Sequence, residues 1–180
     1  IGVTGVQTCA LPICLNLYNT LRLEGVNAAT QLHFYPAGGF SDPGFNKTVE
    51  CPTSGTDANC EGDKYEACVL ATECGGVTCP AKQQLQLSSF LHCFEYEHES
   101  AMKHADGCAR RAGFDLGPIR ACVDSPAAKA KAWAALQAIV QPALPTLKCF
   151  PWIEVDGVVE SKDYNHGCFG RNAATTPLLP

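Results

Sequence analysis

The sequence predicts one α/β domain that carries a helical, cysteine-rich insertion. Segments with helix and strand periodicity alternate near both ends of the chain, and most of the cysteines lie between them. The chain has 180 residues, 46% of them hydrophobic, which is typical of one globular domain. Its net charge of −5 argues against a nucleic-acid-binding protein. Since no apolar run approaches the roughly 18 residues of a membrane span, we expect neither nucleic acid nor a membrane as a partner.

The first elements follow from hydrophobic periodicity and from turn residues. Leu15–Leu23 is expected to form a short helix, and Gln31–Tyr35 a strand. Cys51–Cys79 holds few large apolar side chains, so we expect cross-links, rather than a core of its own, to order it. Two helices are expected next, over Lys82–Glu95 and Glu97–Ala112.

The clearest helix in the chain begins at Ser125-Pro126. Serine is a good N-cap, and proline suits the first helical position. The helix is expected to cover Ala127–Gln141. Its apolar side chains recur at helical spacing and are expected to form a core stripe of Trp133, Leu136, Ile139 and Val140.

A β-hairpin is expected after this helix. Phe150 to Val155 has the alternation of a strand, Asp156-Gly157 is a favoured turn pair, and Val158–Glu160 is the return strand. The predicted order is helix, strand, insertion at about 52–124, long helix and hairpin. This order fits the βαβ…αββ framework of a thioredoxin-like fold whose first strand, before Cys14, is missing or replaced.

The start of the chain has an unusual sequence. Residues 3–13 read VTGVQTCALPI, which resembles the conceptual translation of a common short-read sequencing adapter. We therefore expect residues 1–13 to be a non-native segment and residues 14–180 to be the native domain, so that Cys9 has no role. Codon 14 would begin with the last base of the adapter, so residue 14 could natively be cysteine, arginine, serine or glycine.

Twelve cysteines are more than a chain kept in a reducing compartment usually carries. The chain has no C-x-x-C pair of the kind that marks zinc sites, so we expect disulfides and no metal. One N-x-S/T acceptor, at Asn46, agrees with passage through the secretory pathway. The pairing stays open among ten cysteines that we expect to form structural disulfides: Cys51, Cys60, Cys68, Cys74, Cys79, Cys93, Cys108, Cys122, Cys149 and Cys168.

Three stretches carry a resemblance to a known family. They are LHFYPAGG at Leu32–Gly39, the spacing of Cys60-Glu-Gly-Asp63-x4-Cys68, and PWIEVDG at Pro151–Gly157. With them, the chain resembles the gamma-interferon-inducible lysosomal thiol reductase family over residues 14–168. Asp63 replaces an asparagine of the family signature, and the signature's Gln-His-Gly is absent. An ordered set further along the chain also fits: Cys93, Cys108-Ala109, Gly113, Asp115, Ile119 and Cys122.

The resemblance implies a reductase of protein disulfides, without a cofactor, in a lysosomal, endosomal or extracellular compartment. The family's active site is a C-x-x-C at the start of the first helix, where the helix dipole lowers the pKa of a thiol. Cys14 stands where the second, resolving cysteine belongs, and Leu11 stands where the nucleophile belongs. We therefore expect a truncated and inactive chain.

The resemblance also implies a substrate-binding position and a bracing role for some cysteines. Phe150-Pro151 would lie beside the dithiol, with the proline in the cis form that thioredoxin-like folds use there. Cys51, Cys60 and Cys68 would brace the insertion. The alternative is a secreted, disulfide-stapled interaction protein without redox activity. In either case we expect a monomer.

Overall fold

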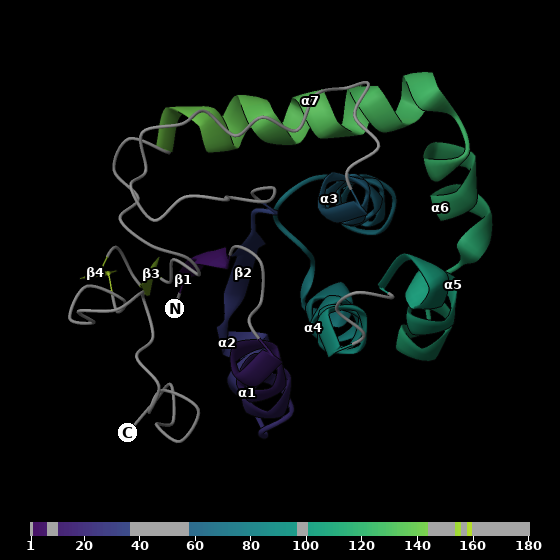
Figure 1. Cartoon of the computed structure of the whole chain (residues 1–180). Helices are drawn as coiled ribbons and strands as arrows, with labels where there is room; N and C mark the ends of the chain where they lie inside the picture. The colour runs from purple at the N-terminus through teal and green to yellow at the C-terminus, as the bar shows by residue number, and fades with distance from the viewer. Residues whose placement is uncertain are drawn as a thin grey trace.

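The computed structural model describes residues 2–6, 11–36, 58–96, 101–143, 154–155 and 158–159, and in these ranges it is mostly helical (Figure 1). Within the described residues, no helix is both long and apolar enough to cross a bilayer. The elements, in chain order, are β1 (Gly2–Val6), α1 (Leu11–Leu21), α2 (Val26–Ala29), β2 (Gln31–Phe34), α3 (Ala58–Val69), the π-helical turn η1 (Leu70–Cys74), α4 (Ala81–Tyr96), α5 (Ala101–Ala112), α6 (Leu116–Val123), α7 (Pro126–Ala143), β3 (Glu154–Val155) and β4 (Val158–Val159).

The four strands form one small sheet in the order β2-β1-β3-β4. β1 pairs with β2 in parallel and with β3 antiparallel, so β1 is an interior strand. The expected α/β class is therefore confirmed in part, because a mixed sheet is present but its strands are short and helices dominate. A strand also stands where one was expected to be missing or replaced. Val3, Thr4 and Val6 are β-branched, which suits that conformation.

The outer edge of β2 is covered by side chains and by a loop. The backbone amide of Leu32 donates to Oε1 of Gln84 on α4, and the amide of Phe34 donates to the carbonyl of Val77 at 2.9 Å. His33 forms a β-bridge with Thr78, whose hydroxyl lies 2.8 Å from Nδ1 of His33. These contacts satisfy backbone hydrogen-bonding groups of β2, which on an exposed strand edge could pair with another chain.

The segment that was expected to lack a core contains the most buried helix. In α3, every residue from Gly62 to Val69 is buried, and Tyr65 stacks on Phe90 and Phe94 of α4, with ring centroids 6.1 and 5.9 Å apart. The prediction that this segment has no core of its own is not contradicted, because α3 has few large apolar side chains, its burial comes from neighbouring helices, and a disulfide at Cys68 cross-links it to α6. In Figure 1, α7 lies across the top of the molecule with α3 beneath it.

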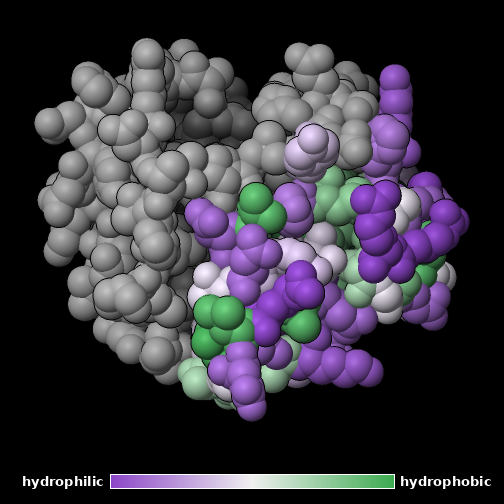
Figure 2. Space-filling view, turned by 90° about the horizontal axis from the view of Figure 1, so that it is seen from below, coloured by the Kyte–Doolittle hydropathy of each residue, from purple (hydrophilic) through white to green (hydrophobic). Residues whose placement is uncertain are grey.

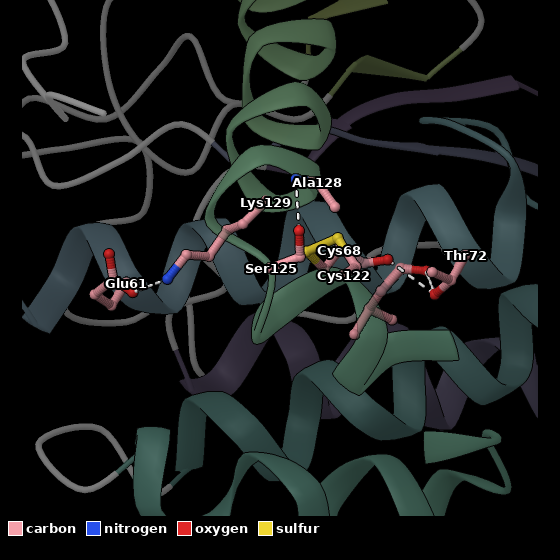
Figure 3. The surroundings of a disulfide bond; sticks show 8 residues. Glu61, Cys68, Thr72, Cys122, Ser125, Ala128 and Lys129 are labelled. Carbon is pink, nitrogen blue, oxygen red and sulfur yellow. Dashed lines mark hydrogen bonds and ion pairs between the residues drawn. A yellow bond between two sulfur atoms is a disulfide. The ribbon is translucent and has the colours of Figure 1, made fainter. Parts of the chain in front are cut away.

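The start of α7 is tied to α3, as Figure 3 shows. Cys68 on α3 forms a disulfide with Cys122 on α6, with Cα atoms 5.7 Å apart. Just beyond, the Ser125 hydroxyl accepts from the Ala128 amide at 3.3 Å, which confirms the predicted N-cap. On the next turn, Nζ of Lys129 donates to Oε2 of Glu61 on α3 at 2.7 Å.

The other helix predictions hold with two corrections. α4 and α5 correspond to the predicted pair, and Gly113 ends α5 with a left-handed φ of 84°. Met102 is 38% exposed, and Ile139 is 47% exposed although it was expected in the core stripe of α7 with Trp133 and Leu136, which are buried. α6 was not predicted at all.

The predicted hairpin is confirmed in its position. β3 and β4 pair antiparallel, with Val155 opposite Val158, and the predicted turn residues 156–157 lie outside the described residues. The paired strands are shorter than expected, and residues 150–153 and 160 lie outside the described part of the chain.

A polar network holds α6 against α3 and α5. The Tyr65 hydroxyl donates to Oδ1 of Asp106 at 3.0 Å, and Nε of Arg120 donates to Oδ2 of Asp106 at 2.9 Å. Burial alone would raise the pKa of Asp106, but the hydrogen bonds from Arg120 and Tyr65 lower it overall. Burial, together with the Asp106 carboxylate, raises the pKa of Tyr65.

Removal of the Cys68–Cys122 disulfide is expected to cost more stability than removal of Cys74–Cys79, which closes a much shorter loop. In the loop-entropy relation, Cys68→Ala/Cys122→Ala should lower the free energy of unfolding by about 4 kcal/mol, and Cys74→Ala/Cys79→Ala by about 2 kcal/mol. The reason is the sequence separation, 54 residues against 5. Urea denaturation of the two double variants measures the difference. Equal losses would contradict this explanation.

Asp106→Asn is expected to destabilise the chain by about 1 kcal/mol at neutral pH, as for a partly exposed ion pair. The pKa of Asp106 is lower in the folded chain than in the unfolded one. Its contribution is therefore full above the unfolded pKa, about 3.9, and is lost as the pH falls through the folded pKa. Urea denaturation along an acid series should show the two proteins converging.

The matched control is Asp124→Asn. Asp124 is 66% exposed and accepts from the same guanidinium at 3.3 Å, but it does not contact Tyr65. Asp124→Asn should lower the free energy of unfolding less than Asp106→Asn at every pH. An equal loss of stability would contradict the role given to the contact of Asp106 with Tyr65.

Candidate functional site

Cys14 lies in the core at the beginning of α1. The helix starts at Leu11, a few residues after the interior strand β1, and Cys14 is 1% exposed beside Leu17 and Leu21 of the same helix. Cys14 is disulfide-bonded in the structure. A cysteine placed in this way is shielded from solvent. It can therefore exchange only with a sulfur atom that a neighbouring residue brings to it.

Leu11 is the first residue of α1 and lies three residues before Cys14. Residues three apart share one face of a helix, so the side-chain positions 11 and 14 are neighbours. The first turn of α1 carries no acidic residue that would oppose the positive end of the helix dipole. The backbone at residue 11 therefore offers the setting that stabilises a thiolate.

α1 is held in place by α4. The Tyr18 ring lies 6.0 Å from the ring of His92, and the Arg22 guanidinium stands 5.2 Å from the centroid of the Tyr18 ring. On the same side of α4, Tyr96 contacts His92 edge-on, with ring centroids 6.4 Å apart. The packing of α1 on α4 fixes the orientation of the helix that carries Cys14.

The described surface seen from below is mostly hydrophilic, with separate hydrophobic spots, as Figure 2 shows.

The structure brings six of the expected cysteines together as three disulfides. Cys68–Cys122 joins α3 to α6, Cys93–Cys108 joins α4 to α5, and Cys74–Cys79 closes a short loop. Cys60 lies in the first turn of α3. Six predicted positions lie outside the described residues: Asn46, Cys51, Cys149, Phe150, Pro151 and Cys168. Among the described side chains, no group of three His, Cys, Asp or Glu residues is placed to hold a metal.

Sequence reasoning missed Gln84. This glutamine is buried, its Nε2 donates to the Thr30 carbonyl at 2.9 Å, and its Oε1 accepts from Leu32. It connects α4 to the start of β2, the strand next to β1. A glutamine among other polar residues of a helix carries no signal for such a role, since the partners lie about fifty residues away in the chain.

Sequence reasoning also missed the charged residues of α3 and η1. Asp63, Lys64 and Glu66 are buried. Burial alone would raise the pKa of Glu61, but hydrogen bonds from Lys129 and Lys64 lower it overall. Burial raises the pKa of Glu73, and the negative charge of Asp115 adds to the rise. Asp63 replaces the asparagine of the family signature, and its burial shows that this position faces the interior.

The burial of residue 14 limits which native residue it could be. Cys14→Arg is expected to be about 3–5 kcal/mol less stable than Cys14→Ser, because a guanidinium would be buried without a counter-charge. Both variants lose the disulfide of Cys14, so their difference isolates the cost of the charge. Thermal or urea unfolding measures it. The control is Leu15→Arg against Leu15→Ser, because Leu15 is exposed and the pair should differ little. Equal stabilities at position 14 would contradict this placement.

Comparisons with known proteins agree with the resemblance seen in the sequence. The family model of the gamma interferon inducible lysosomal thiol reductase (GILT) matches residues 5–112, which is more than half of the chain. The match begins within the adapter-like residues 3–13 and covers β2, α3, α4 and α5. The comparison with curated proteins gave no match, and neither did the comparison with solved structures. On the strength of the family match, the chain belongs to the gamma-interferon-inducible lysosomal thiol reductase family.

Proposed function

We propose that the chain is the scaffold of a thiol–disulfide oxidoreductase whose dithiol site lies at the start of α1, and that the chain as written lacks the nucleophilic cysteine and is inactive. Membership of the family implies thiol reductase activity. The observation that carries the assignment of the site is the position of Cys14. It is buried one turn into a helix that follows the interior strand of the sheet.

The sheet supports a thioredoxin-like arrangement around this site. β1 and β2 are parallel and are connected through α1 and α2, and the β3–β4 hairpin adds antiparallel to the other side of β1. This element order supports the proposed βαβ…αββ framework. Helices α3 to α6 lie between β2 and α7 in the chain, where the insertion at about 52–124 is proposed.

The chemistry needs two sulfurs at positions 11 and 14. A thiolate at position 11 attacks one sulfur of a substrate disulfide, forms a mixed disulfide and releases the other substrate sulfur as a thiolate, which takes up a proton. The thiolate of Cys14 then attacks the sulfur at position 11, so the enzyme disulfide forms and the second substrate thiol leaves. With leucine at position 11, the first step has no nucleophile.

The proposed substrates are disulfide-bonded proteins in the secretory pathway, in a lysosomal, endosomal or extracellular compartment. The disulfides of the chain fit such an oxidising environment. The lowered pKa values of Glu61 and Asp106 keep both carboxylates charged, and their ion pairs intact, as the pH becomes mildly acidic.

Leu11→Cys tests this proposal directly, because it places a thiol one turn before Cys14. In a Cys9→Ser background, which removes the nearest other cysteine in the sequence, this variant is expected to reduce a denatured, disulfide-bonded protein with turnover. Its thiol pKa is expected within the range of about 3.5–7.5 found at helix N-termini. Thiolate absorbance measured along a pH series gives the pKa, and release of substrate thiols gives the activity.

Two matched variants identify the source of the activity. Asn19→Cys places a thiol on an exposed turn further along α1, where the pKa should stay near the ordinary value of about 8.5. Adding Cys14→Ala to the Leu11→Cys variant should trap the mixed disulfide and abolish turnover. If the Leu11→Cys variant is no more active than the chain as written, the site is wrong, and the chain is better described as a disulfide-stapled interaction protein. That alternative is favoured by one observation, the disulfide-bonded state of Cys14.

A further inference from the structure

The Cys74–Cys79 disulfide differs in its placement from Cys68–Cys122 and Cys93–Cys108. Cys68–Cys122 and Cys93–Cys108 each join two helices, whereas Cys74–Cys79 closes a loop between η1 and α4 with a sequence separation of 5. The loop contains Gly75 and Gly76, both with positive φ, and nothing lies within 4 Å of a Cβ placed on either glycine. Opening this disulfide therefore separates no pair of helices.

A cavity of about 380 Å³ lies beside this disulfide. It lies between the end of α2 and the start of α4, and Cys79 is part of its wall. Its volume is within the range of small-molecule sites, about 300–1,000 Å³. The side chains of Thr30 and Gln31 and the backbone of the α2–β2 connection give it polar groups, which can hydrogen-bond the amide groups of a small peptide-like molecule.

We propose that Cys74–Cys79 is a second exchangeable disulfide of this chain, and that its cavity admits a low-molecular-weight, peptide-like thiol. The thiolate of the small thiol attacks Sγ of Cys79, the cysteine that lines the cavity, and Cys74 leaves as a thiolate. A second small thiol attacks the mixed disulfide and leaves Cys79 as a thiolate. Two small thiols become one small disulfide, and their two protons pass to Cys74 and Cys79.

Reduction of this disulfide changes the cover of the sheet edge. The loop that it closes supplies the Val77 carbonyl to the amide of Phe34 and the Thr78 bridge to His33. Both contacts come from residues between the two cysteines. When the disulfide opens, the loop is no longer held against β2, and the outer edge of that strand becomes available.

The experiment uses the full chain in glutathione buffers with an increasing fraction of the reduced form. Acid quenching, alkylation and mass spectrometry give the redox state of each cysteine, circular dichroism follows helix content, and hydrogen–deuterium exchange follows the amide of Phe34. Cys74 and Cys79 should be reduced first, at unchanged helix content, and the Phe34 amide should exchange faster. Simultaneous reduction of Cys74–Cys79, Cys68–Cys122 and Cys93–Cys108 with loss of helix would overturn the proposal.

A cavity-filling variant separates recognition of the small thiol from simple exposure. Ala28 lines the cavity and is exposed. Ala28→Phe should slow reduction by glutathione several-fold and leave reduction by a small phosphine unchanged. Ala135→Phe, at an exposed position on α7, should change neither rate. If Ala28→Phe slows both reductants equally, or neither, the cavity does not select the thiol and the proposal is wrong.

Discussion

The packing of the other helices around α3 is the interaction on which the described structure depends. α3 contacts α5, α6 and α7, and its Tyr65 stacks on two phenylalanines of α4. Aromatic side chains bury large areas, and stacked pairs add to the stabilisation beyond their area. The Cys68–Cys122 disulfide then fixes α6 to this helix. Without α3, α7 would lose the helix that lies beneath it (Figure 1).

The burial of α3 places charged groups in the interior, and they are stabilised by opposite charges. Lys64 is only 3% exposed and lies 3.0 Å from the carboxylate of Glu61, which also pairs with Lys129 of α7. A buried charge without a partner is costly, so these ion pairs constrain which helix can lie above α3. The Asp106 network acts in the same way between α3, α5 and α6. The Asp106 network and the Cys68–Cys122 disulfide therefore both hold α6 beside α3.

The cysteines that the structure describes stand in three different settings. Two disulfides join helices and lie within the helical layer. Cys14 lies at the start of α1, where a dithiol can use the helix dipole and where burial protects the resolving sulfur. Cys74–Cys79 closes a surface loop over the edge of β2, next to a cavity. β2 pairs in parallel with β1, with Gln31 opposite Gly2, so the cavity lies at the end of the sheet where β1 begins, whereas α1 follows the end of β1.

Several features could be predicted from the sequence because they depend on neighbouring residues. The Ser125 cap, the left-handed Gly113 and the antiparallel pairing of β3 with β4 follow from backbone preferences that act over a few positions. The many cysteines indicated disulfides, and the resemblance to the family indicated Cys14 as one cysteine of a dithiol. The spacing of Cys74 and Cys79 made a local closure plausible without proving it.

The sequence by itself therefore determined the helix and turn signals, the oxidised state of the chain and the family to which it belongs. Only the tertiary structure decided that α3 is the buried helix, that Cys68 pairs with Cys122, and that Gln84 completes the edge of β2. The physical reason is the distance along the chain between the residues that interact. A cap or a turn is set by residues within one turn of helix, whereas burial and cross-links depend on segments that meet only when the chain has folded.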